Sequence, residues 1–166
     1  MPDAPSQKRL PLHTGGCQCG AVRYALYAEP NNVSVCHCRM CQKASGNLFQ
    51  AFGGVKRAEF AWTRGAPKFF NSSEVIARDF CADCGTPLTF RQLDKDRVSI
   101  SVGSLDHPER VPITMQYGME SCIPGVDNIN RLPGQKTGDL VDPARAPKLA
   151  SRQHPDHDTP VWPPTN

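Results

Sequence analysis

The sequence predicts a mainly β protein of small antiparallel sheets, with little helix and with metal as part of its framework. Short stretches of alternating polar and apolar residues recur along the chain, separated by glycine-containing turns. Helical periodicity is almost absent. Several of the eight cysteines form close pairs beside turns, an arrangement typical of metal-binding knuckles. Together these observations favour short strands that bound metal holds in place.

The expected strands follow one another through the first two thirds of the chain. The clearest is 97–102, where Val98, Ile100 and Val102 occupy every second position and are expected to face the core. The other expected strands lie at 21–26, 33–35, 49–52, 59–62, 68–70, 75–80 and 86–91, with two less regular ones at 111–113 and 115–117.

One short helix is expected over residues 39–45, and Gly46 is expected to end it. This helix would place Cys41 in its first turn, near the positive end of the helix dipole. That position favours a thiolate.

The length of 166 residues suits one domain with appendages. Residues 1–13 contain prolines and polar residues without periodicity, so we expect a flexible leader. Residues 14–137 are expected to form the metal-binding domain. Residues 138–166 are rich in proline and charge, and are expected to be a disordered or loosely docked tail.

Charge and hydropathy exclude several classes of partner. The net charge is +3 with 21% charged residues, and no run of Lys or Arg indicates binding to nucleic acid or anionic membranes. No stretch approaches the roughly 20 apolar residues of a membrane span. The first nine residues lack the apolar core of a signal peptide. We therefore expect a soluble, cytoplasmic protein, and the sequence indicates no oligomeric state.

The cysteines could form disulfides or bind metal, and their spacing favours metal. A reducing cytosol disfavours disulfides. A glycine-framed turn at 15–20 holds a Cys-x-Cys pair, and 81–85 reads Cys-x-x-Cys-Gly. The disulfide alternative would need a secretory route that the N-terminus does not show. Zn²⁺ is the usual ion for such ligands.

Seven of the cysteines divide into one complete and one incomplete metal site. The complete site is expected to be structural, because four thiolates leave no free position and tie the start of the domain to its middle. The incomplete site leaves a fourth position for water or a substrate atom, as catalytic zinc sites do. The expected ligands are Cys17, Cys19, Cys81 and Cys84 for the structural Zn²⁺, and Cys36, Cys38 and Cys41 for the open Zn²⁺ site.

Three cysteine blocks in this order resemble the glutathione-dependent formaldehyde-activating enzymes, a family grouped with centromere protein V. The resemblance spans most of residues 14–135 and rests on the motifs at 16–20, 36–46, 80–88 and 103–106. It implies a zinc-binding β-tent fold with the same two sites. It also implies a carbon-sulfur lyase that joins glutathione and formaldehyde as S-hydroxymethylglutathione, with glutathione as its small-molecule partner.

The open site suits carbon-sulfur chemistry. We expect a soft thiol to replace water at the fourth position, where the metal lowers its pKa so that a thiolate attacks a small carbonyl. Three thiolate ligands weaken zinc as a Lewis acid and keep a fourth sulfur labile. Two alternatives stay open: a non-catalytic, zinc-stabilised binding module, or a family enzyme acting on a different glutathione adduct.

Two residues near the open site have more than one interpretation. His37 could be a fourth ligand or a proton shuttle. Cys122 could close the site, act as a nucleophile, or be an ordinary buried or loop thiol.

Polar residues elsewhere leave similar alternatives. Gln42, Lys43 and Ser45 could hold a substrate carboxylate or hydroxyl, or could form a solvated helix face. His154 and His157 could bind metal, although we expect them to be polar residues of a disordered tail.

Overall fold

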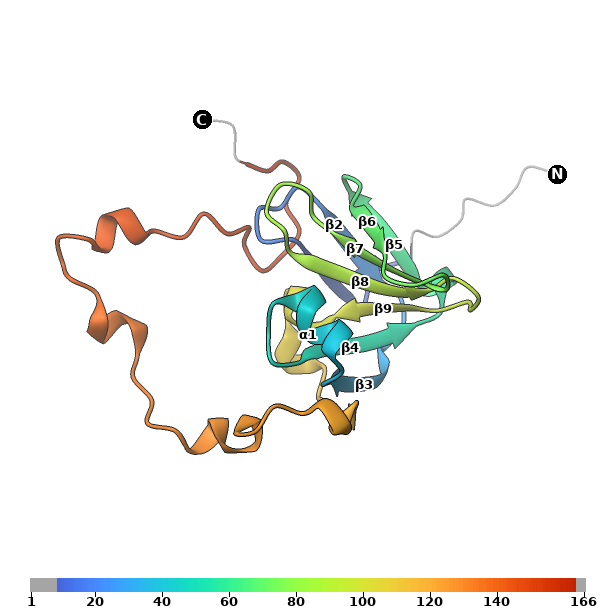
Figure 1. The fold of residues 1–166 in the computed structure, drawn as a ribbon. Coiled ribbons are helices and arrows are strands. Elements are labelled where there is room, and N and C mark those ends of the chain that lie inside the picture. Colours follow the sequence, from blue (N-terminus) through green and yellow to red (C-terminus); the bar gives the residue numbers. More distant parts are fainter. Residues whose placement is uncertain (1–8, 164–166) are drawn as a thin grey trace.

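A computed structural model describes residues 9–163, and within them the chain forms two β-sheets and one short α-helix (Figure 1). The sheets have the strand orders β1-β2-β5 and β10-β3-β4-β9-β8-β7-β6. The mainly β fold class is confirmed. The strands are β1 His13–Gly16, β2 Arg23–Leu26, β3 Asn31–Cys36, β4 Gln50–Val55, β5 Phe60–Arg64, β6 Lys68–Asn71, β7 Ile76–Phe80, β8 Pro87–Gln92, β9 Val98–Ser101 and β10 Met115–Tyr117.

The strand pairing is antiparallel except at one edge, where β10 runs parallel to β3. The expectation of antiparallel sheets did not include this pair. A parallel partner requires a long crossover, and here the whole chain between Cys36 and Met115 provides it. The irregular strand expected at 111–113 is absent, because these residues belong to the connection that leads into β10.

In the first sheet, a strand replaces part of an expected turn. Gly15 and Gly16 lie in β1, paired with Tyr24 and Arg23, so the turn expected at 15–20 begins only after them. All four residues of β2 are buried. Residues 1–8, most of the expected leader, lie outside the described residues.

The core lies between the two sheets and is built from buried residues of strands in both of them. Val98 and Ile100 of β9 are buried as expected, and Val102 remains buried in the 3-10 turn that follows. Tyr24 is fully buried, and its hydroxyl lies 2.8 Å from Ser104 Oγ. Burial of each such large side chain contributes roughly 2 kcal/mol to folding.

The helix α1 (Arg39–Ser45) has the predicted bounds. Cys38 is its N-cap, and the Cys38 thiol accepts a hydrogen bond from the Cys41 backbone N–H. Gly46 ends the helix in the left-handed conformation, at φ 64°, as expected. No helix within residues 9–163 has the length and apolar content of a membrane span.

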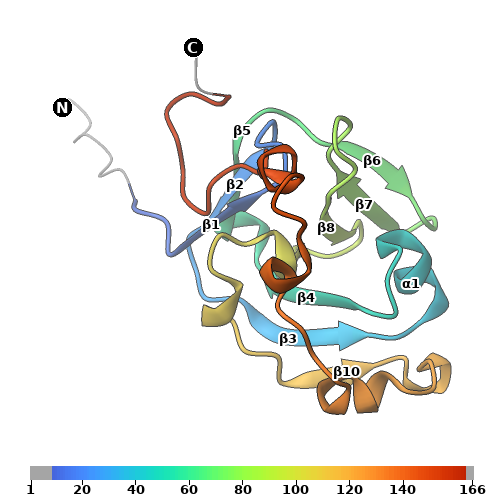
Figure 2. The same ribbon diagram turned by 90° about the vertical axis from the view of Figure 1, so that its left-hand side faces the viewer.

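Beyond residue 122 the chain leaves the body in a wide arc and returns beside the loop between β1 and β2 (Figures 1 and 2). The arc contains only short 3-10 turns, and most of its side chains are exposed. Its last described residues dock firmly. The backbone N–H of His154 donates to Gln18 O at 2.8 Å, and the Trp162 indole donates to Cys19 O at 2.7 Å.

The docked end of the tail corrects the interpretation of His154 as a polar residue of a disordered segment. Its side chain is only 3% exposed and packs edge-on against the Trp162 ring. Asp158, also in the tail, accepts hydrogen bonds from the buried Arg23 at 2.6 and 3.0 Å. A Cβ atom at Gly20 would overlap the Trp162 ring, so glycine at this position permits the docking.

Candidate metal centre

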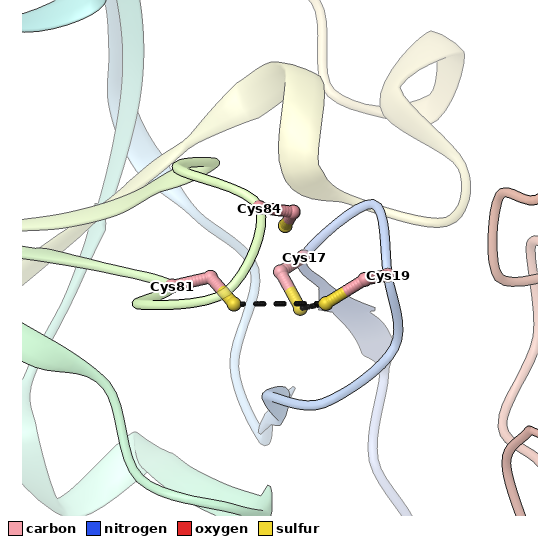
Figure 3. A group of neighbouring side chains, drawn as sticks. All are labelled: Cys17, Cys19, Cys81 and Cys84. Atoms are coloured by element: carbon pink, nitrogen blue, oxygen red, sulfur yellow. Dashed lines mark hydrogen bonds between the residues drawn. The ribbon is translucent and has the colours of Figure 1, made fainter.

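Four cysteines from two loops point their sulfurs to a common centre (Figure 3). Cys17 and Cys19 lie on the β1–β2 loop, and Cys81 and Cys84 on the β7–β8 loop. All four Sγ atoms lie within 4.8 Å of one another, with 3.5 Å between Cys17 and Cys19 and 3.7 Å between Cys19 and Cys81. Tetrahedral coordination with metal–sulfur bonds of about 2.3 Å places sulfurs about 3.8 Å apart. This group could therefore hold a metal ion.

Backbone hydrogen bonds shape both loops for this purpose. The Val22 N–H donates to Cys17 Sγ at 3.2 Å, and the Gly85 N–H donates to Cys81 O at 3.0 Å. The Thr86 hydroxyl accepts a hydrogen bond from the Gln18 N–H at 3.1 Å and lies 3.2 Å from Cys84 Sγ. The two loops are thus joined to each other as well as to their own sulfurs.

The thiols of this group differ in acidity. Burial raises the pKa of the Cys19 thiol to about 12. Burial also raises the pKa of Cys84, but hydrogen bonds from the Thr86 hydroxyl and backbone outweigh this and lower it to about 6. A metal ion must therefore displace protons from part of the group when it binds.

The second group contains three cysteines at the junction of β3 and α1. Cys36 ends β3, Cys38 caps the helix and Cys41 lies in its first turn, and their Sγ atoms lie within 4.8 Å of one another. No fourth Cys, His, Asp or Glu from residues 9–163 joins them. The group could hold a metal ion with one coordination position free of protein.

The helix cap and a buried arginine polarise these sulfurs. Burial raises the pKa of the Cys41 thiol to about 12, although the Arg78 guanidinium, whose Nη2 lies 3.4 Å from Cys41 Sγ, acts in the opposite direction. Burial also raises the pKa of Cys38, but the backbone N–H of Cys41 and neighbouring groups outweigh it and lower the pKa.

A cavity of about 270 Å³ adjoins the three-cysteine group. Cys36 and Cys41 form part of its wall, so an atom bound to these sulfurs has access to the space. Three aromatic residues, Phe52, Phe90 and Tyr117, also line it, and the ring centroids of Phe52 and Phe90 lie 5.5 Å apart. Arg97 is the charged residue of the lining, and the lining contains no carboxylate.

The other residues predicted near the open site are used in the fold. The Gln42 side-chain amide donates to His37 O at 2.6 Å and to Ser121 O at 3.0 Å. The Ser45 hydroxyl donates to Cys41 O at 2.9 Å, and Lys43 is exposed on the helix. Gln42 and Ser45 are therefore not free to hold a substrate.

The remaining candidate ligands lie outside both groups. His37 is buried, with Nε2 3.0 Å from Gln116 Oε1, and its ring does not join the cysteines beside it. Cys122 joins neither sulfur group. Among the described residues His154 and His157 belong to no metal-binding group either.

Sequence reasoning did not identify Arg78 or Gln50. Both side chains are buried, and the Arg78 Nη1 donates to Gln50 Oε1 at 3.3 Å. The one available signal is an arginine three residues before Cys81 within an otherwise regular strand. That signal does not show which sulfur the arginine meets, because Cys41 is 37 residues away.

Comparison with known proteins places these observations in a family. The family model described as glutathione-dependent formaldehyde-activating enzyme matches residues 12–120. An uncharacterised lyase of Schizosaccharomyces pombe is 31% identical over 81 residues, which are 49% of this chain and 58% of that protein. The match therefore spans less than two thirds of that relative.

A solved structure supports the fold independently. A Rhodobacter sphaeroides protein of known crystal structure superposes with a TM-score of 0.51 at 19% identity, covering 62% of this chain and 98% of that one. At this identity the similarity concerns the fold alone.

Proposed function

This chain belongs to the glutathione-dependent formaldehyde-activating enzyme family, and from that premise we propose that it is a zinc-dependent carbon-sulfur lyase. The reaction joins a glutathione-like thiol to formaldehyde as S-hydroxymethylglutathione, or releases the two again. The observation that carries the proposal is the three-cysteine group, which adjoins a cavity and has no fourth protein ligand among residues 9–163.

The two sulfur groups have different roles in this proposal. The group of Cys17, Cys19, Cys81 and Cys84 binds a structural Zn²⁺, because four thiolates complete a tetrahedron. The group of Cys36, Cys38 and Cys41 binds the second Zn²⁺ and leaves one position for the thiol substrate. Thiolate ligands of this number select a soft ion and a soft fourth ligand.

The reaction is an addition without oxidation or reduction. The thiol sulfur forms a bond to the formaldehyde carbon, the carbonyl π bond breaks, and the thiol proton ends on the oxygen as a hydroxyl. When bound, Zn²⁺ lowers the pKa of the incoming thiol, so that it is a thiolate near neutral pH.

The cavity supports an anionic thiol as substrate. Its space of about 270 Å³ exceeds what formaldehyde alone needs, so the thiol partner accounts for most of it. Arg97 presents a guanidinium to this space, and the absence of carboxylates from the lining leaves that charge available to a substrate carboxylate. Glutathione carries such carboxylates.

The test combines metal counting with a spectroscopic titration. We expect two metal ions per chain after purification under reducing conditions. After Co²⁺ replaces the metal, added glutathione is expected to change the sulfur-to-cobalt absorption. The protein is further expected to accelerate exchange between free and thiol-bound formaldehyde, followed by NMR with ¹³C-formaldehyde.

Matched cysteine variants localise the response. Cys38→Ser is expected to abolish the spectral change and the exchange while the fold remains. Cys122→Ser removes a thiol outside both groups and is expected to leave both signals intact. Two bound metal ions with no response to glutathione or any other small thiol would instead identify a non-catalytic binding module. A response to other thiols but not to glutathione would identify a family enzyme for a different adduct.

A further inference from the structure

Arg78 is a buried arginine whose guanidinium faces sulfur. Arg78 lies on β7 and is only 7% exposed. Nη2 donates to Cys41 Sγ at 3.4 Å, Nη1 to Gln50 Oε1 at 3.3 Å and Nε to Ser72 Oγ at 3.3 Å. The guanidinium carbon also lies 5.0 Å from the centre of the Phe90 ring. Each of the three guanidinium nitrogens therefore has a hydrogen-bond partner, and the guanidinium also contacts an aromatic ring.

No carboxylate among residues 9–163 forms an ion pair with Arg78. The adjacent Asp79 points to the other face of the strand, where it accepts hydrogen bonds from Arg91 at 2.6 and 2.8 Å and one from Thr89. Gln50 and Ser72 are neutral. A buried guanidinium without a counter-charge costs several kcal/mol, on the order of the penalty for any unpaired buried ion. A negative group must therefore lie close to it.

The three-cysteine group is the source of that negative charge. Three thiolates exceed the charge of a divalent ion, so the group remains anionic with metal bound. A fourth thiolate from a substrate would add to the excess. Arg78 donates directly to one of these sulfurs, and an arginine N–H to an anionic sulfur is a charge-assisted hydrogen bond.

We propose that Arg78 is a positioning residue that supplies the counter-charge of the three-cysteine metal site and thereby admits an anionic sulfur as its fourth ligand. This role rests on the proposed function, because its purpose is to let the site bind a substrate thiolate. Its effect on metal binding does not depend on any substrate. Specificity follows from charge: with Arg78 in place, a thiolate can join the site without a large excess of negative charge.

The sulfurs of the four-cysteine group have different neighbours. Its sulfurs meet backbone and hydroxyl groups, such as the Val22 N–H at 3.2 Å and the Thr86 hydroxyl at 3.2 Å. Within the part of the chain that the structure describes, none of its sulfurs accepts a hydrogen bond from an arginine. It can therefore act as an internal control for any substitution of Arg78.

The test is a metal titration of the full-length chain against a chromophoric chelator, without glutathione or formaldehyde. Arg78→Met keeps the apolar stem and removes the charge. It is expected to weaken Co²⁺ and Zn²⁺ binding at the three-cysteine site by about 10- to 100-fold, the usual effect of losing a partner of a metal ligand. Binding at the four-cysteine site is expected to be unchanged. Arg78→Lys retains the charge and is expected to recover part of the affinity and of the cobalt absorption spectrum.

Arg97→Met is the matched control. Arg97 lines the cavity beside the three-cysteine group, but its guanidinium donates to Asn31 O at 3.1 Å and to Asn31 Oδ1, and not to sulfur. Metal affinity at both sites is expected to be unchanged. An equal loss in Arg97→Met would mean that the general potential of the cavity matters rather than the contact with Cys41, and would overturn the proposal.

Other outcomes also decide the matter. Equal weakening of both metal sites in Arg78→Met would show a role in folding only, and unchanged affinity at both would show that the counter-charge lies elsewhere. If Arg78→Met does not fold, Arg78→Gln carries the test, because its amide can donate a hydrogen bond without a charge; full affinity in this variant would overturn the proposal.

Failure of the lyase proposal would be visible separately. The wild-type protein could fail to respond to glutathione while Arg78→Met still binds metal more weakly than wild type. That result would retain the role of Arg78 at the metal and reject only the thiol substrate. A normal response of metal-loaded Arg78→Met to glutathione would instead preserve the lyase and overturn the role of Arg78 in admitting the thiolate.

Discussion

The indole of Trp162 donates a hydrogen bond to the backbone carbonyl of Cys19 across 143 residues of sequence. Together with the backbone contact from His154 to Gln18, it fastens the end of the tail onto the loop that carries the first cysteine pair. The tail therefore contacts the loop that carries Cys17 and Cys19. Its docking joins the last described residues to the loop that holds half of the four-cysteine group.

Replacement of Trp162 by alanine is expected to release the tail. Loss of one hydrogen bond and of the packing against His154 should lower the free energy of unfolding by about 1–2 kcal/mol. Chemical denaturation measures this change, and limited proteolysis should cut the tail faster. Leu149→Ala, at an exposed position of the same tail, should change neither. Equal proteolysis of Trp162→Ala and wild type would contradict the docking.

Gly20 allows a prediction that separates backbone strain from lost docking. Gly20 and Gly46 both have positive φ, at 76° and 64°, but only Gly20 has the Trp162 and His154 rings where a Cβ would lie. Gly46→Ala should cost about 1 kcal/mol through strain alone. Gly20→Ala should cost about 2–3 kcal/mol, because it also displaces the tail.

A double variant checks the reason for this difference. If Gly20→Ala acts by displacing Trp162, then Gly20→Ala combined with Trp162→Ala should be less destabilising than the sum of the two. Urea unfolding of the four proteins measures the coupling. Strict additivity would mean that the alanine is accommodated without moving the tail.

The buried pair of Arg23 and Asp106 predicts sensitivity to acid. The carboxylate accepts hydrogen bonds from the guanidinium at 2.7 and 2.5 Å. Burial raises the pKa of Asp106, but the hydrogen bonds and charge of Arg23 outweigh it and hold the pKa below its ordinary value. The contribution of Asp106 is therefore complete above its unfolded pKa of about 4 and is lost as the pH falls through the folded pKa.

Asp106→Asn tests this pair directly. At neutral pH the variant should lose about 3 kcal/mol of stability, because Arg23 keeps only the tail residue Asp158 as a carboxylate partner. The loss should shrink as the pH falls below about 4, where wild type loses the same interaction. Thermal unfolding across this pH range measures both. Asp94→Asn, in an exposed turn, should show neither effect.

The two sulfur groups predict different consequences of losing one cysteine. Cys84→Ser should prevent a complete four-sulfur site, so the protein should unfold at lower denaturant concentration and bind less metal. Cys38→Ser should remove metal from the other group with a smaller effect on folding, because α1 and β3 are also held by their backbone hydrogen bonds. Circular dichroism and metal analysis measure the two effects. Equal destabilisation by both variants would assign a structural role to both groups.

Local patterns in the sequence predicted much of the fold. The period-two stretch at 97–102 became β9, and residues 39–45 became α1 with Gly46 as its end. These features depend on neighbours within a few residues, where backbone geometry decides the outcome. The parallel pairing of β10 could not be predicted in this way, because a strand of three residues carries no local signal for the strand it pairs with.

The cysteine pattern predicted the grouping of the sulfurs but not their surroundings. The spacing of the cysteines placed all seven in the groups that the structure forms. It did not show that Gln42 and Ser45 are occupied by backbone contacts, nor that His37 faces Gln116. Some of those partners lie in segments that are distant in the sequence. The others are nearby backbone groups, and the residue type alone does not predict these local hydrogen bonds.

The sequence by itself determined how the seven cysteines group and where most strands and the helix lie, because close spacing and short periods constrain a chain locally. Only the tertiary structure decided that Arg78 meets Cys41 and that Trp162 meets Cys19, because each contact joins segments 37 and 143 residues apart. Burial then gives these contacts their strength, since a guanidinium or a carbonyl removed from water must find its partner within the protein.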